Sequence, residues 1–284
     1  MSERILLAGC GDLGRRVAER LLARGDEVFA LRRRPPENGG GDIRWVRGDL
    51  GRPEGLAALP QGVTRLVYLP TPDARDEAAY RTVFVDGLRY LFEALDGSAL
   101  RRVLYVSSSA VYGDHGGAWV DEDTPAVPPG FNGRVLLEAE QWLLRQAASM
   151  RVSPVVLRLA GLYGPGRLQL LERLRAGAAR VPRAGPHWAN RIHVDDAAAA
   201  IAHLLGVADP EPLYLGVDDT PLPIDVLYDH LASLLGVAPP QAGQAPAGVG
   251  SKRLSNARLR ASGFVPRWPD AREGYAMLPG VAAT

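Results

Sequence analysis

Short apolar runs alternate with helical patterns of apolar and polar residues from the start of the chain to Leu159. Six of these runs have the length of buried strands, and they are 5–8, 28–31, 44–47, 66–69, 103–107 and 155–159. Hydrophobic repeats of helical spacing occupy most of the intervals between them. This alternation predicts an α/β fold with a Rossmann-type, doubly wound parallel sheet.

The rhythm changes after the segment Tyr163-Gly-Pro-Gly166. Apolar periodicity predicts three further helices, at 168–176, 195–206 and 224–235. Between 239 and 250 the chain is rich in Pro, Gly, Ala and Gln, and it offers almost nothing to bury. We expect this stretch to be a solvent-exposed connector.

The first predicted strand leads directly into a glycine-rich turn and then into a helical pattern. Gly9 would permit the tight turn, Gly11 would leave no Cβ facing a pyrophosphate, and Gly14 would let the helix pack closely. Phosphates would rest on the free N–H groups at the helix start. This context predicts a dinucleotide site, with a purely structural glycine turn as the alternative. The residues expected to form it are Gly9, Cys10, Gly11, Asp12, Leu13 and Gly14.

The end of the second strand should select between the two nicotinamide cofactors. An NAD site places a carboxylate there for the ribose hydroxyls, but this strand ends in Arg32, Arg33 and Arg34. Guanidinium groups pair bidentately with phosphate, so Arg32 or Arg33 facing a 2′-phosphate favours NADP over NAD. The alternative is a solvated charge run in an arginine-rich protein.

Two further strand ends are expected at the same site. Asp49 and Leu50 close the third strand, where a carboxylate can meet the adenine amino group or can belong to a surface turn. Leu69 and Pro70 end the fourth strand and are predicted cofactor contacts.

Composition narrows the function classes. The chain has 284 residues, is 46% hydrophobic and carries a formal net charge of +1, which suits a large core and offers no field for nucleic acid or anionic lipid. Its start lacks a hydrophobic signal region, and no apolar stretch has the length of a membrane span, so we expect a cytoplasmic protein. Cys10 is the only cysteine, which excludes an internal disulfide, and the scattered histidines predict no metal site.

The ordered motifs resemble the extended short-chain dehydrogenases/reductases of the NAD-dependent epimerase/dehydratase type, and especially atypical bacterial members described as nucleoside-diphosphate-sugar epimerases. The resemblance covers nearly the whole chain. Besides the glycine turn it is carried by Val106-Ser-Ser-Ser-Ala-Val-Tyr-Gly113, Asp121-Glu-Asp-Thr-Pro125, Leu157-Arg-Leu-Ala-Gly-Leu-Tyr-Gly-Pro-Gly166, Asn190-Arg-Ile-His-Val-Asp-Asp196 and Lys252-Arg-Leu-Ser-Asn256.

The resemblance implies a Rossmann domain that binds the cofactor and a smaller, discontinuous C-terminal lobe that binds substrate. We expect the Rossmann domain to comprise 1–165 and 188–218, and the lobe 166–187 and 219–284. The expected substrate is a nucleotide sugar or another anionic metabolite, and the superfamily commonly forms homodimers.

Catalysis in that family depends on a tyrosine, a lysine four residues later, and a serine or threonine. The tyrosine phenolate takes a proton from a substrate hydroxyl while hydride moves to or from the nicotinamide, and the lysine lowers the tyrosine pKa. No Tyr-x-x-x-Lys exists here, because the only lysine is Lys252 and Gly248 stands four residues before it. The family pattern places Asn132 at the tyrosine position and Leu136 at the lysine position. Phe84 replaces the asparagine of a further family motif.

Ser108 is the remaining catalytic candidate, because it stands four residues before Tyr112, as in the family. Ser107 is expected beside the cofactor, although hydroxyls at a strand end also bond to backbone. The resemblance places Tyr112, Asn190, Arg191 and His193 toward the substrate, and Arg191 suits an anionic group. A surface ion pair between Arg191 and Asp195 or Asp196 is the alternative.

Three hypotheses follow. The chain is an NADP-dependent epimerase, dehydratase or oxidoreductase with altered acid/base residues; or it is an inactive protein that senses NADP(H); or, least favoured, it is a scaffold with a vestigial cofactor site.

Overall fold

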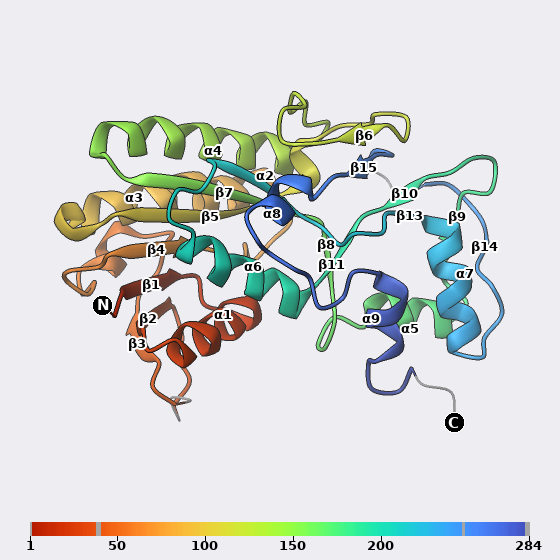
Figure 1. Ribbon diagram of the computed structural model, residues 1–284, viewed down its shortest axis with the longest axis horizontal. Coiled ribbons are helices and arrows are strands. Elements are labelled where there is room, and N and C mark those ends of the chain that lie inside the picture. The colour runs from red at the N-terminus through yellow and green to blue at the C-terminus, as the bar shows by residue number, and fades with distance from the viewer. Residues whose placement is uncertain (1, 38–40, 246–247, 282–284) are drawn as a thin grey trace. The chain divides into compact units, whose positions relative to one another are not determined.

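A computed structural model of the chain describes residues 2–37, 41–245 and 248–281 (Figure 1). These residues form two compact units, and the chain passes between them several times. Unit 1 comprises 1–111, 130–158 and 198–214, and unit 2 comprises 112–129, 159–197 and 215–284. The predicted division into a cofactor-binding domain and a substrate-binding lobe stays a prediction, because these units are defined by contacts within the chain and not by bound ligands.

A seven-stranded sheet forms the centre of unit 1. Its strands, in spatial order, are β12 (Leu213–Gly216), β7 (Ser153–Leu159), β5 (Arg102–Ser108), β4 (Arg65–Tyr68), β1 (Arg4–Ala8), β2 (Glu27–Arg32) and β3 (Arg44–Arg47). The pairs from β5 through β4, β1 and β2 to β3 are parallel. The strand order reverses between β1 and β4, and ligands of such sheets bind at the carboxyl ends of the strands at this switch point.

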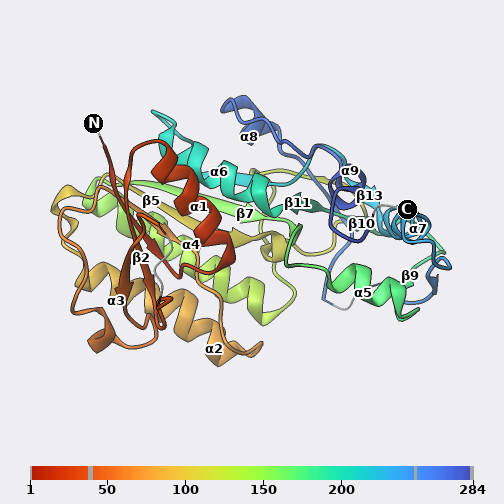
Figure 2. The ribbon, with the colours of Figure 1, turned by 90° about the horizontal axis from the view of Figure 1, so that it is seen from below.

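Helices cover both faces of this sheet, which explains why the central strands β1, β4 and β5 are buried almost continuously rather than in alternation (Figure 2). One face packs against α1 (Asp12–Ala23) and the unit 1 part of α6 (Val194–Gly206). The other lies under α2 (Glu77–Arg81), α3 (Gly87–Ala94) and α4 (Phe131–Met150). A π-helical turn, Thr82–Asp86, joins α2 to α3, and short 3-10 turns occupy Pro53–Leu56, Gly97–Ala99 and Ser109–Val111.

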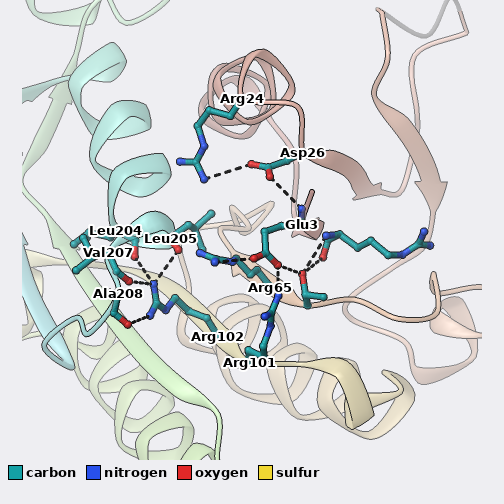
Figure 3. Close-up of polar contacts among 12 residues, drawn as sticks. Glu3, Arg24, Asp26, Arg65, Arg101, Arg102, Leu204, Leu205, Val207 and Ala208 are labelled. Carbon is teal, nitrogen blue, oxygen red and sulfur yellow. Dashed lines mark hydrogen bonds and ion pairs between the residues drawn. The ribbon is translucent and has the colours of Figure 1, made fainter. Parts of the chain in front are cut away.

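The buried guanidinium of Arg102 holds the C-terminal end of α6 to the start of β5 (Figure 3). It donates hydrogen bonds to the carbonyl oxygens of Leu204, Leu205, Val207 and Ala208. The last carbonyls of a helix have no partner within the helix, so this side chain satisfies groups that burial would otherwise leave unpaired.

Unit 2 is built from short paired strands and small helices. The strand pairs are β6 (Trp119–Val120) with β15 (Arg253–Leu254), β8 (Gly161–Tyr163) with β11 (Arg191–His193), β9 (Arg180–Val181) with β14 (Gln241–Ala242), and β10 (Trp188–Ala189) with β13 (Leu222–Pro223). The helices are α5 (Gln169–Arg175), α7 (Ile224–Leu234), α8 (Ala257–Ala261) and α9 (Ala271–Ala276). Leu171, Leu227 and Tyr275 are among the residues of its apolar core.

The structure confirms the predicted fold class and all six predicted strands, and α5, α6 and α7 match the three predicted later helices. It adds a seventh strand, β12, which the sequence pattern did not single out. The solvent exposure predicted for 239–250 is confirmed for residues 241–245 and 248–249, and the structure adds the short strand β14 in this stretch, which pairs with β9. Backbone pairing of this kind needs no apolar side chains; residues 246–247 of this stretch lie outside the described residues.

No helix among the described residues combines the length and the apolar character that a membrane span requires.

Candidate dinucleotide site

The turn that follows β1 can be made only with glycine. Gly9 has a φ of +92°, and a Cβ there would lie 2.4 Å from Pro70 Cα. The N–H groups of Gly9 and Cys10 both donate to the Leu31 carbonyl, at 3.1 and 3.2 Å, which ties the turn to the end of β2. The sequence therefore sends the chain sharply from β1 toward α1 at the carboxyl edge of the sheet.

Gly14 and Gly11 differ from Gly9 in what surrounds them. A Cβ on Gly14 would lie 3.0 Å from Cys10 Sγ and 3.4 Å from Leu69 Cδ1, so this glycine serves close packing. A Cβ on Gly11 would meet no protein atom within 4 Å. Gly11 is the N-cap residue that precedes α1, and it has no side chain with which to cap the helix. The space beside Gly11 is therefore open at the start of α1, which is where a helix binds an anion.

A hollow of about 810 Å³ lies along this edge of unit 1. Such a volume suits a cofactor-sized ligand. It is lined by residues that follow β1, β2, β3 and β4, together with the start of the π-helical turn. Eight of the predicted cofactor residues line it, namely Gly9, Cys10, Gly11, Arg32, Arg33, Asp49, Leu50 and Pro70. Asp12 lies in an adjoining hollow with Arg32, while Leu69 is buried behind the turn.

The arginines at the end of β2 are not equivalent. Arg33 forms a bidentate ion pair with Asp73, whereas Arg32 has no ion pair or side-chain hydrogen bond within the described part of the chain. Asp49 accepts a hydrogen bond from the Gly51 N–H at 3.0 Å, which fixes a local turn. Of Arg32 and Arg33, Arg32 is therefore the one whose guanidinium is not engaged by a carboxylate among the described residues.

The Cys10 thiol is buried in the glycine turn, being 1% exposed. Burial raises its pKa to about 11, and the positive charges of Arg32 and Arg15 offset only part of that effect. The side chain is therefore a neutral thiol at physiological pH, which makes it a packing group rather than a nucleophile.

The side chains of Ser107 and Ser108, at the end of β5, lie in different surroundings. The hydroxyl of Ser107 donates to Glu140, a buried residue of α4. Glu140 in turn pairs with Arg158 of β7, with Arg158 Nη2 2.6 Å from Glu140 Oε2. The Ser107 side chain is thus engaged inside unit 1. Ser108 Oγ accepts a 3.2 Å hydrogen bond from the Ala110 N–H, which leaves its O–H available to donate.

Neither family acid/base position can perform the expected chemistry. Leu136 lies on the inner face of α4 and is 4% exposed, so an apolar side chain fills the place of the lysine. Asn132 lies in the first turn of α4 and is partly exposed. An amide has no accessible pKa that would let it act as the phenolate does. The structure thus offers no local substitute for the tyrosine and lysine pair on α4.

The predicted substrate residues all lie in unit 2, where most of their polar atoms are engaged. The Tyr112 hydroxyl donates to the Asp121 carbonyl at 2.9 Å, and the Asn190 amide joins the Lys252 carbonyl to the Leu254 N–H. His193 is buried, and its Nδ1 accepts from the Asp195 N–H at 3.2 Å.

Arg191 has a different environment. Its Nε is buried without a hydrogen-bond partner among the described residues, and its charge acts on Asp218. Burial raises the pKa of Asp218 to about 8. The alternative ion pair of Arg191 with Asp195 or Asp196 is not formed: Asp196 accepts from the backbone N–H groups of Arg267 and Trp268, and Asp195 lies 3.7 Å from His193.

Sequence reasoning missed part of the lining. The segment after β4, Thr71-Pro72-Asp73, faces the hollow, as do Arg34, Arg52, Thr82 and Val83. The sequence could have indicated part of this lining, because the residues that follow parallel strands near the switch point lie at the edge of the sheet where ligands bind. Among the described residues, no group of three or more His, Cys, Asp or Glu side chains is placed to hold a metal ion.

The switch-point hollow and the glycine turn that leads into α1 define a nucleotide-binding protein of the Rossmann class. Comparison with known families is specific: residues 5–214 match the sequence model of the NAD dependent epimerase/dehydratase family. The chain belongs to this family.

Similar proteins extend over nearly the whole chain. A solved structure from Methylobacillus flagellatus, provisionally described as an NAD-dependent epimerase/dehydratase, is 40% identical, with a TM-score of 0.81 and 98% of each chain covered. Protein YeeZ of Escherichia coli (strain K12) is 29% identical over 277 residues, covering 94% of this chain and 97% of YeeZ. MoeE5, solved in complex with UDP-glucuronic acid and NAD, is 26% identical, with a TM-score of 0.81 and 97% of each chain covered.

Proposed function

We propose that this chain binds NADP(H) at the switch-point hollow and acts as an enzyme on a nucleotide sugar or a related anionic metabolite. The observation that carries the cofactor assignment is the combination of Gly9, the open space at Gly11 and the uncapped start of α1. These features fit a pyrophosphate and serve no evident packing purpose at Gly11. NADP is favoured over NAD because arginines occupy the strand end where an NAD site holds a carboxylate.

In this proposal Gly9 to Gly14 would hold the pyrophosphate, Arg32 would meet the 2′-phosphate, and Asp49 would lie toward the adenine. The nicotinamide, when bound, supplies or accepts hydride. Ser108 would position a substrate oxygen through its free O–H. The proton transfer would use a group other than the family tyrosine, because Asn132 and Leu136 cannot supply it. Similarity to MoeE5, whose solved complex contains UDP-glucuronic acid and NAD, supports the substrate class.

The cofactor proposal has a test that separates binding from folding. Replacement of Gly11 by Val adds a side chain that meets no protein atom near its Cβ but would occupy the phosphate position. We expect Gly11→Val to keep the wild-type melting temperature and to weaken NADPH binding at least about ten-fold in titration calorimetry. Equal NADPH affinity in both proteins, or none in the wild type, would contradict the proposal.

The catalytic proposal needs a second test. The wild-type protein with NADP(H) or NAD(H) would be incubated with a panel of UDP- and dTDP-sugars, following nicotinamide absorbance and product separation. Epimerised, dehydrated or oxidised product supports an enzyme. Tight NADPH binding that discriminates between redox forms, with no conversion of any panel member, would instead support the sensor hypothesis, which membership of an epimerase/dehydratase family does not favour.

A further inference from the structure

An ion pair crosses the proposed cofactor hollow above β1. Arg33 directly follows β2, and Asp73 lies in the segment that follows β4. In the sheet β1 lies between β2 and β4, so the two side chains meet over the carboxyl end of β1, where the glycine turn begins. Both residues line the hollow of about 810 Å³ together with Gly9 and Gly11. The pair is 40 residues apart in sequence and wholly within unit 1.

The pair uses the same atoms of Arg33 that a phosphate would use. Nη1 donates to Asp73 Oδ2, and Nη2 donates to Asp73 Oδ1, which is the fork arrangement that a guanidinium also offers to phosphate oxygens. The hydrogen bond to Arg33 lowers the pKa of the Asp73 carboxyl, so Asp73 stays ionised at neutral pH. Asp73 and a bound phosphate would therefore compete for one cation and would also repel each other.

The two side chains are accessible enough for this competition. Exposed fractions are 53% for the Arg33 side chain and 70% for that of Asp73, so neither must leave a packed environment to separate. Arg32, beside them, pairs with no carboxylate in the part of the chain that the structure describes. A 2′-phosphate can thus be held by Arg32 without Arg33, or by both if Asp73 releases Arg33.

We propose that Asp73 determines cofactor specificity by occupying Arg33 in place of the adenosine 2′-phosphate. This inference rests on the proposed binding of NADP(H) at the hollow. Asp73 weakens NADP(H) binding relative to what the arginines alone would provide. It leaves NAD(H) nearly unaffected, because a ribose hydroxyl cannot displace a carboxylate from a guanidinium. Asp73 thereby reduces the preference for the phosphorylated cofactor by engaging Arg33, without itself binding the phosphate.

The test compares NADPH and NADH affinities of the wild type and Asp73→Asn by titration calorimetry at fixed ionic strength. We expect NADPH to bind about three- to ten-fold more tightly to Asp73→Asn, and NADH to change less than about two-fold. Glu77→Gln is the matched control, because it removes one negative charge four residues further on, from an exposed position that does not line the hollow. We expect no selective gain from it.

The mechanism is tested by repeating Asp73→Asn in an Arg33→Ala background. The gain in NADPH affinity from Asp73→Asn should be smaller in that background, because the Arg33 cation for which Asp73 and the phosphate compete is no longer present. An undiminished gain, equal tightening of both cofactors, or no change in NADPH affinity would overturn the inference.

Wild-type affinities separate failure of the inference from failure of the proposed function. NADPH binding that appears only in Asp73→Asn would support the inference and contradict the NADP preference of the wild type. Absence of NADPH binding in both proteins would refute both proposals.

Discussion

The buried ion pair between Glu140 and Arg158 should be the most sensitive polar contact of unit 1. Their side chains are only 3% and 7% exposed, and Arg158 Nε lies 3.2 Å from both carboxylate oxygens while Nη2 approaches Oε2 to 2.6 Å. Glu140→Gln keeps the shape but removes the negative charge that pairs with the buried Arg158 cation. Breaking one side of such a pair costs about 3–5 kcal/mol. Because glutamine still offers one acceptor oxygen, we expect about 3 kcal/mol.

Urea unfolding followed by circular dichroism measures this cost as a change in midpoint at constant slope. Glu138→Gln is a control on the same helix. Glu138 pairs with Arg81 at 2.6 Å, but the side chains are 37% and 44% exposed, and an exposed pair contributes less than about 1 kcal/mol. The double replacement Glu140→Leu with Arg158→Met should be less destabilising than the sum of its single replacements, since it leaves no unpaired charge.

A Glu140→Gln cost as small as that of Glu138→Gln would refute this reasoning, and so would a double variant whose cost equals the sum. Either result would mean that the buried charge is solvated in a way that the contacts of Glu140, Ser107 and Arg158 do not account for.

Three further predictions concern other features. Gly9→Ala should lower the melting temperature and abolish NADPH binding, because a Cβ would lie 2.4 Å from Pro70 Cα; a stable variant that binds normally would contradict the assignment of this turn. Arg102→Met should lower stability by about 2 kcal/mol, since two carbonyls in the last turn of α6 and two just after it lose their donor, and hydrogen exchange should increase there and not in α4. The pKa of Asp218 is about 8 in the folded state, against a value near 4 in the unfolded state. Between these values the folded state binds a proton that the unfolded state has lost. The free energy of unfolding of the wild type should therefore fall as pH rises from about 4 to about 8, by at most about 1.4 kcal/mol per pH unit. Asp218→Asn should remove this part of the pH dependence, and an unchanged urea profile between pH 6 and pH 9 would show that the carboxyl titrates elsewhere.

Local patterns predicted much of unit 1 because its strands are buried on both faces. Continuous apolar runs such as 5–8 and 103–107 can be read without knowing their neighbours. The glycine turn could also be predicted from the sequence, since the roles of Gly9 and Gly14 follow from backbone conformation and close packing. Strand β12 could not be predicted in this way, because a run of four residues is recognised as a strand only from its pairing beside β7.

The candidate site was less predictable than the fold. The residues that face the hollow come from several strand ends, and the partner of Arg33 lies in a segment with no apolar periodicity. Exposed ion pairs depend on which loops meet in space, and no local spacing encodes that. Ser107 shows the same limit, because its hydroxyl direction depends on Glu140, which lies on a different element. The roles of the predicted site residues in binding stay predictions.

The position of β12 in the chain has a consequence for biosynthesis. The sheet receives its last strand from 213–216, after the polypeptide has already contributed a long stretch to unit 2. A ribosome-bound fragment that stops after β7 would carry the whole glycine turn yet expose the edge of β7 that β12 later covers. Such a nascent chain should depend on a chaperone or on continued translation to avoid aggregation, and the nucleotide-binding half should not be obtainable as a simple N-terminal truncation.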